Sequence, residues 1–155
     1  MTSLLNYMSK EMVVLLVAAM PVMELRGAIP LGISMGVDPI KALIIGMIGS
    51  MIPVPFLLVL LEPVFEKLRE NDYMKKIVDK IVNRTIKKTS TIHKYKAIGL
   101  LLFVAVPIPT TGVWTGAMAA SLLKIRFVPA LINILIGNTI AALIIAYLSN
   151  VVANI

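Results

Sequence analysis

The chain has 155 residues, 59% of them hydrophobic and 15% charged, and its mean hydropathy of +0.94 exceeds that of water-soluble domains. These values predict an all-α integral membrane protein, and the short length excludes a large pump with its own nucleotide-binding domain. The net charge is +7, but ten of the fifteen basic residues lie between Lys67 and Lys96, which indicates a cytoplasmic loop beside anionic lipid and not a nucleic-acid surface. Cysteine is absent, which excludes disulfides, thiolate metal sites and thiol redox centres.

The first apolar segments are short. Two runs extend over Met12–Met23 and Gly27–Val37, with Glu24 and Arg26 between them. A helix needs about 20 residues to cross the hydrocarbon core, so neither run crosses it alone. No basic segment or cleavage site precedes the first run, so we do not expect a removable signal peptide.

A longer uncharged run extends over Ala42–Leu61 and ends at Glu62. Its length predicts a membrane-spanning helix. Pro53 and Pro55 lie inside this run, and proline lacks a backbone donor and clashes with the preceding turn. We therefore expect a kink or a local break in this helix.

The same order recurs in the second half of the chain. Short runs over Ala97–Val106 and Val113–Leu123 flank an interruption at residues 107–112, and the long run Phe127–Leu148 follows. The order short, short, long therefore occurs twice. It predicts an internal repeat, although residue identity between the two halves is low.

Residues 62–96 separate the two copies and carry most of the basic side chains. Within this segment a set of positions recurs at steps of three and four, with lysines largely between them, which predicts an amphipathic helix on the inner membrane surface. These positions are Met74, Ile77, Val78, Ile81, Thr85 and Ile86. We interpret the lone His93 as a solvated side chain and not as a proton relay.

The distribution of basic residues predicts the orientation. If residues 67–96, Lys124 and Arg126 are cytoplasmic, the short runs in residues 97–123 begin and end at the cytoplasmic face, and those in residues 12–37 at the outer face. We therefore predict one membrane domain with repeat 1 in residues 1–61, a cytoplasmic linker in 62–96 and repeat 2 in 97–155. Each repeat is a re-entrant helical hairpin plus a transmembrane helix, and the two repeats are inverted. The alternative is that each short pair forms two thin spans.

Glu24 and Arg26 are the most informative residues in the first hairpin. A carboxylate and a guanidinium in an apolar tract cost several kcal/mol unless they pair or face a cavity. Side chains two positions apart diverge on a helix, so we expect a loop here, shaped by Pro21, Gly27 and Pro30. Glu24 then carries a proton or meets a cationic substrate while Arg26 holds an anion such as phosphate; the alternative is a structural ion pair that locks the hairpin tip.

Residues 107–112, with the sequence PIPTTG, form the corresponding tip of the second hairpin. Pro107 and Pro109 bar a regular helix, and the hydroxyls of Thr110 and Thr111 are able to bind an oxyanion. The exposed backbone amides that begin at Gly112 add to this predicted site. Ordinary helix capping by either threonine is the alternative.

Three further residues are candidates for lining a pathway, namely Trp114, Asn133 and Asn138. For each of them, packing within or between helices is the alternative interpretation. The chain contains no zinc-protease motif, no phosphate-binding loop and no catalytic triad pattern. We therefore expect neither an enzyme nor a bound cofactor or metal.

The motif ELRGAIPLG at residues 24–32 and the motif PIPTTGVWTG at residues 107–116 resemble the putative small multidrug export protein family, and the resemblance covers nearly the whole chain. It implies a membrane transporter. The family is in turn distantly similar to the DedA/VTT membrane proteins, which have paired re-entrant hairpins and are implicated in moving lipids such as the polyprenyl phosphate carrier between leaflets. By this resemblance Glu24 corresponds to the acidic residue of the first hairpin, whereas the arginines of the second DedA hairpin have no counterpart at residues 110–112.

The sequence supports two classes of function. The first is a transporter, proton-coupled or passive, that moves a small amphiphile or a lipid phosphate through a site where the two hairpin tips meet; a lipid flippase or scramblase is a variant of it. The second is a non-transporting membrane scaffold whose basic helix binds anionic lipid or a partner. We expect a multi-pass protein of the plasma membrane, a homodimer, with membrane lipids and no nucleic acid as partners.

Overall fold

The computed structural model describes residues 9–88, 96–108 and 111–153, and every regular element within these ranges is an α-helix. The helices are α2 (Lys10–Ala19), α3 (Glu24–Ser34), α4 (Pro39–Met51), α5 (Pro53–Arg69), α6 (Asp72–Lys88), α8 (Lys96–Ala105), α9 (Val113–Leu122) and α10 (Phe127–Ala153). The predicted all-α class is confirmed. The amphipathic pattern of the basic segment also gives a helix, α6.

Helices α4 and α5 together form one long apolar segment, Pro39–Leu68, and α10 provides a second, Phe127–Val152. Both are long and apolar enough to cross a membrane. Asp38 directly precedes the first segment and caps it: its carboxylate accepts hydrogen bonds from the backbone nitrogens of Ile40 and Lys41 at 3.0 and 3.2 Å. A capping aspartate followed by proline is a favourable helix start, because proline has no backbone donor to leave unpaired.

The expected interruption of this segment lies at Ile52, directly before Pro53, where α4 ends and α5 begins. The uncharged run ends at Glu62, but the helix does not end with it, since α5 continues to Arg69. Glu62 is exposed on the helix surface, so its charge does not have to be buried for the helix to continue.

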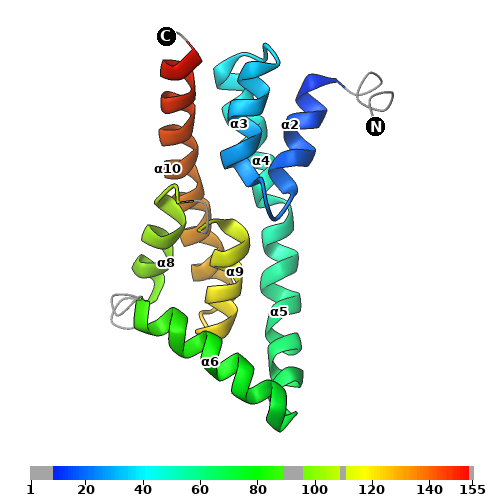
Figure 1. Cartoon of the computed structure of the whole chain (residues 1–155), viewed down its shortest axis with the longest axis vertical. Coiled ribbons are helices and arrows are strands. Elements are labelled where there is room, and N and C mark those ends of the chain that lie inside the picture. The colour runs from blue at the N-terminus through cyan, green and yellow to red at the C-terminus, as the bar shows by residue number, and fades with distance from the viewer. Residues whose placement is uncertain (1–8, 89–95, 109–110, 154–155) are drawn as a thin grey trace.

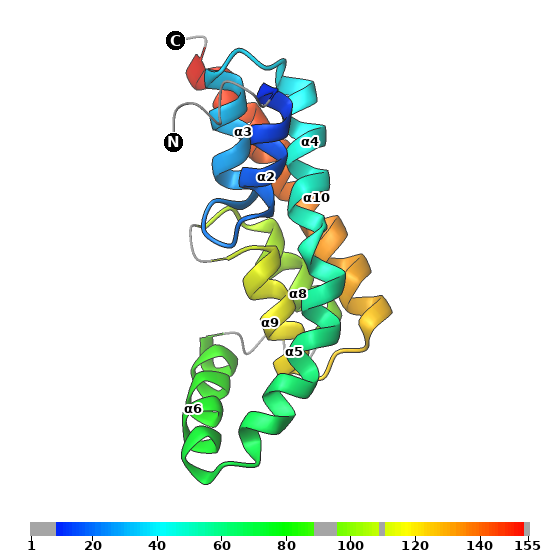
Figure 2. The same cartoon turned by 90° about the vertical axis from the view of Figure 1, so that its right-hand side faces the viewer.

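Two helical hairpins approach the middle of the molecule from opposite ends (Figure 1). Helices α2 and α3 pack beside α4, and α8 and α9 lie beside α10 and α5 respectively. In addition α3 packs on α10, so the second helix of each hairpin contacts the long helix of the other half. The basic helix α6 packs on α5 at the end of the molecule that is remote from the start of α2 and the end of α10 (Figures 1 and 2).

Several features recur 88 residues apart in the chain, the spacing of the hydrogen-bonded pair Ser50 and Asn138. Helices α3 and α9 end at this spacing, and α4 and α10 begin at it. After α3 and after α9 the chain turns through a residue with positive φ, Gly36 at 80° and Lys124 at 50°. The three backbone hydrogen bonds donated by Met35, Gly36 and Val37 match those donated by Leu123, Lys124 and Ile125 in relative position.

The distribution of polarity is the reverse of that in a soluble domain. Large apolar side chains are exposed along the outer surfaces of the long helices, for example Ile40 at 69%, Phe56 at 66% and Leu143 at 56%. The buried polar and charged residues are Glu24, Ser50, Ser121 and Asn138. An apolar exterior around a partly polar interior is typical of helices that contact lipid.

Candidate functional site

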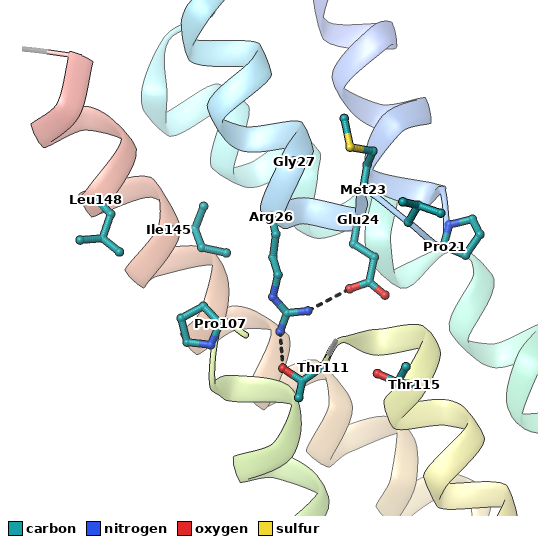
Figure 3. Close-up of a pocket in the computed structure, with 11 residues that line it drawn as sticks. Pro21, Met23, Glu24, Arg26, Gly27, Pro107, Thr111, Thr115, Ile145 and Leu148 are labelled. Atoms are coloured by element: carbon teal, nitrogen blue, oxygen red, sulfur yellow. Dashed lines mark hydrogen bonds and ion pairs between the residues drawn. The ribbon is translucent and has the colours of Figure 1, made fainter. Parts of the chain in front are cut away.

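The candidate site lies where the ends of the two hairpins meet (Figure 3). From the first hairpin it takes the loop at residues 20–23 and the first turn of α3. From the second it takes the end of α8, the residues that follow it, and the beginning of α9. Residues about 90 positions apart in the chain are thereby brought into hydrogen-bond contact.

Glu24 links the two hairpins through its carboxylate. One carboxylate oxygen, Oε1, accepts a hydrogen bond from the backbone nitrogen of Trp114 at 3.2 Å, and the other, Oε2, lies 3.3 Å from Nη1 of Arg26. Trp114 lies in the first turn of α9, which has no side-chain cap of its own. The buried carboxylate therefore takes the place of a capping residue at the positive end of that helix.

Arg26 makes the complementary contact with the end of α8. Its Nη2 donates to the carbonyl oxygens of Val106 at 3.1 Å and Val104 at 3.3 Å, and to Oγ1 of Thr111 at 3.2 Å. A guanidinium at the carbonyl end of a helix is favoured by the helix dipole. Nε of Arg26 is buried and has no hydrogen-bond partner among the described residues, so one donor of this side chain is unused.

The backbone of Glu24 explains how two residues at this spacing are able to pair. The sequence predicted a loop through Glu24 and Arg26, and this prediction is wrong, because both residues belong to α3. The loop instead occupies residues 20–23. Glu24 is the first residue of the helix and has a φ of 48°, in the left-handed region that costs a non-glycine residue about 1–2 kcal/mol. Because its backbone departs from helical values, its side chain does not follow the direction that a regular helix would give it.

Gly112 occupies a place that admits no side chain. A Cβ atom there would overlap Oε2 of Glu24 and would lie 2.6 Å from Nη1 of Arg26. The backbone at Gly112 is extended, with a φ of 175°, so the requirement for glycine comes from this close approach and not from the backbone conformation. Beside it, Thr111 donates to the carbonyl oxygen of Val106 at 2.7 Å, which holds the loop against the end of α8.

A pocket of about 430 Å³ opens beside the ion pair. Its polar wall is formed by Glu24, Arg26, Thr111 and Thr115. Its other lining residues are Pro21, Val22, Met23, Gly27, Pro107, Ile145 and Leu148. The sequence analysis did not identify Thr115, Val22, Met23, Ile145 or Leu148, and the aliphatic residues among them have no feature that distinguishes them from their neighbours in the chain.

The structure brings some of the predicted tip residues together and separates others. Pro21 and Pro107 line the pocket, as does Gly27, although Gly27 lies within α3. Pro30, predicted to shape the tip, is instead inside α3, about two turns away from the loop, and it is exposed. Proline has no backbone N–H, so the carbonyl of Arg26 loses the hydrogen bond that residue 30 would otherwise donate within the helix. Pro109 and Thr110 lie outside the described residues, as does His93.

None of the three residues proposed to line a pathway is among the pocket residues. The indole of Trp114 donates from Nε1 to the carbonyl oxygen of Ala19 at 3.3 Å, so it bridges the hairpins instead. Asn138 is buried and donates to Oγ of Ser50 at 2.9 Å, which joins α10 to α4. Asn133 bonds to a carbonyl of its own helix. The two asparagines therefore correspond to the packing alternative.

The site combines one negative and one positive side chain with hydroxyl groups and an apolar wall. Among the described residues no group of three histidine, cysteine, aspartate or glutamate side chains is placed to hold a metal ion. What the arrangement offers a ligand is a pair of opposite charges, hydroxyl groups and an apolar surface.

Comparisons with known proteins give the family. No curated protein and no solved structure matches the chain. The family model described as "Putative small multi-drug export protein" matches residues 24–144, a range that begins at the first residue of α3 and includes α9 and most of α10. The chain belongs to this small multi-drug export family, whose name describes membrane transporters.

Proposed function

We propose that the protein is a multi-pass transporter of the plasma membrane that exports a small amphiphilic compound through the pocket between the hairpin tips. The observation that carries the proposal is a buried ion pair, Glu24 and Arg26, beside a pocket whose remaining wall is largely apolar. Ionisable residues inside a membrane are costly and are typically kept for function. The family and the two long apolar helices support a transporter.

The topology that we propose is an inverted repeat of two re-entrant hairpins. Each hairpin helix has only 10 or 11 residues, which corresponds to about 15 Å and is half of the hydrocarbon thickness. The recurrence of helix ends and turns 88 residues apart supports two equivalent halves. The basic residues around α6, together with Lys124 and Arg126, favour the cytoplasm for that end of the molecule.

The chemistry of the pocket favours a zwitterion or an anion with an apolar body. Glu24 and Arg26 offer opposite charges side by side at the pocket wall, to which a ligand with both signs of charge is complementary. Val22, Met23 and Leu148 are exposed at the apolar part of the wall and suit a hydrocarbon body. In this proposal Glu24 is also the group that takes up a proton when transport is coupled to a proton gradient. A phospholipid also combines a charged headgroup with an apolar body, so it is a second candidate substrate. The similarity to DedA proteins stays a prediction.

Flux through reconstituted vesicles tests the proposal. The purified protein is inserted into liposomes loaded with a fluorescent zwitterionic amphiphile or a fluorescent cationic dye, with and without a pH gradient, and a fluorescent phospholipid reports movement between leaflets. We expect Glu24→Gln to lower flux at least tenfold while the protein still elutes as a single folded species, because glutamine retains an oxygen that accepts from Trp114. Glu66→Gln, at an exposed carboxylate, is the matched control and keeps full flux.

Each result has a defined meaning. Wild-type flux in Glu24→Gln would remove Glu24 from the mechanism. If neither probe nor any phospholipid moves in the wild-type protein, the transporter proposal fails and the membrane scaffold is favoured. The partners that belong to the proposal are anionic lipids, which the exposed Lys75, Lys76 and Lys80 of α6 contact at the inner face, and a second copy of the chain.

A further inference from the structure

Arg26 and Trp114 have corresponding places in the two hairpins. They are 88 residues apart, the spacing at which the helix ends recur, and each lies in the first turn of the second helix of its hairpin. Each also reaches across to the opposite hairpin. Arg26 donates to the carbonyl of Val106 at the end of α8, and Trp114 donates through Nε1 to the carbonyl of Ala19 at the end of α2.

The surroundings of these two side chains correspond as well. Helix α3 packs on α10 beside Arg26, and α9 packs on α5 beside Trp114. Ile145 of α10, which lines the pocket, has its counterpart 88 residues earlier in Leu57 of α5. A pocket on the α5 side would therefore lie between helices equivalent to those of the pocket on the α10 side, with Gly112 and Trp114 at the positions that correspond to Glu24 and Arg26.

The two sides differ in what fills that space. Beside Arg26 there is an open pocket of about 430 Å³. Beside Trp114 the indole packs against a buried cluster that includes Val54 and Leu58 of α5, with Leu57 at its edge. The large aromatic ring thus packs on α5 at the chain position that corresponds to Arg26 beside the open pocket.

We propose a second binding site for the same amphiphile between α9 and α5, formed when the Trp114 indole leaves this cluster. This proposal rests on the proposed function, and it gives the transporter a binding site that is accessible from the opposite side of the membrane. The two halves exchange conformations: each half adopts the conformation that the other had before. The site beside α5 then opens toward the α6 end while the pocket beside α10 closes. The ligand meets the same ion pair from either side, since Glu24 and Arg26 stand between the hairpins.

The absence of cysteine from the chain makes the exchange measurable. Leu57→Cys and Ile145→Cys are made separately, in membranes that are open to a polar maleimide on both sides. We expect Trp114→Ala to label Leu57→Cys at least tenfold faster and Ile145→Cys correspondingly more slowly. Trp114→Phe keeps a ring and removes only the donor, so we expect opposing changes of about fivefold, the equilibrium equivalent of one hydrogen bond.

Phe103→Ala is the matched control, because Phe103 of α8 packs on the same cluster as Trp114. It enlarges the space there without releasing the Trp114 contact, so we expect no fall in labelling of Ile145→Cys. The lone tryptophan, which is partly buried, also checks the fold of this control, since a folded Phe103→Ala variant keeps the emission maximum of the wild-type indole.

The outcomes separate this proposal from the proposed function. Faster labelling of Leu57→Cys without slower labelling of Ile145→Cys would indicate a simple cavity and would overturn the second site, as would unchanged labelling at both positions. If Trp114→Ala does not fold, the labelling rates of Leu57→Cys and Ile145→Cys in the Trp114→Phe protein decide between these outcomes. Opposing changes in a protein that moves no probe would leave the exchange standing and overturn the transport function alone.

Discussion

Replacement of Gly112 by alanine tests the contact between the hairpin tips directly. The new Cβ would overlap the Glu24 carboxylate and lie 2.6 Å from Nη1 of Arg26, so the ion pair or α9 has to move. The backbone there is extended, a conformation that alanine adopts without strain. Any loss of stability therefore comes from the site itself.

The expected magnitude follows from the contacts that are displaced. A hydrogen bond to a charged group contributes about 1.5–3 kcal/mol, and over-packing of a close contact costs about 1–3 kcal/mol. A movement that breaks the hydrogen bond also relieves the over-packing, so the two costs do not add in full. We therefore expect the free energy of unfolding to fall by about 2–4 kcal/mol in Gly112→Ala. The measurement is reversible unfolding in mixed micelles with increasing dodecyl sulfate, followed by helical circular dichroism.

Gly27→Ala is the control, because it places a Cβ at the same pocket but 3.0 Å from Sδ of the flexible Met23 side chain. Alanine also gains about 1 kcal/mol over glycine within a helix, so we expect a net change within about 1 kcal/mol. If Gly112→Ala unfolds at the same dodecyl sulfate fraction as the wild type, Gly112 does not lie against the Glu24 carboxylate and the site as described is wrong.

Two further substitutions test the packing that positions the site. In Ser50→Ala the buried Asn138 amide retains only a carbonyl at 3.5 Å, so we expect a loss of about 1–3 kcal/mol in the same unfolding assay; a neutral result would contradict this buried hydrogen bond. Gly137→Ala places a Cβ 2.7 Å from the carbonyl oxygen of Leu101, a backbone atom that yields little, so we expect α8 and α10 to separate at a cost of about 1–3 kcal/mol. A Gly137→Ala protein more stable than the wild type would show that helix propensity outweighs this contact.

Hydropathy and proline positions were sufficient to predict most of the helices. Length alone distinguishes the short runs that became α2, α3, α8 and α9 from the long run that became α10. Pro53 predicted the interruption between α4 and α5, because the missing backbone donor acts locally and independently of the rest of the fold. The end of α5 could not be predicted in this way, because the charge of Glu62 ends an apolar run without ending a helix.

The geometry of the site could be predicted only in part. Glu24 and Arg26 were recognisable as costly charges in an apolar tract, but the left-handed backbone of Glu24 is not encoded by the residue type, so a loop was predicted where a helix begins. Gly112 was expected to expose its amide to a ligand, whereas in the structure it also admits the carboxylate from the other hairpin. Such requirements arise from contacts between distant segments, which a single sequence does not display.

The hydrogen bond between Ser50 and Asn138 has a geometric consequence. These residues are related by the same 88-residue spacing as the helix ends. In the inverted repeat that we propose, two related points that touch must lie next to the twofold rotation axis that would superimpose the halves. Points beside an axis move least when the halves trade places. This buried pair is therefore suited to act as a pivot, unbroken while the hairpins rock around it.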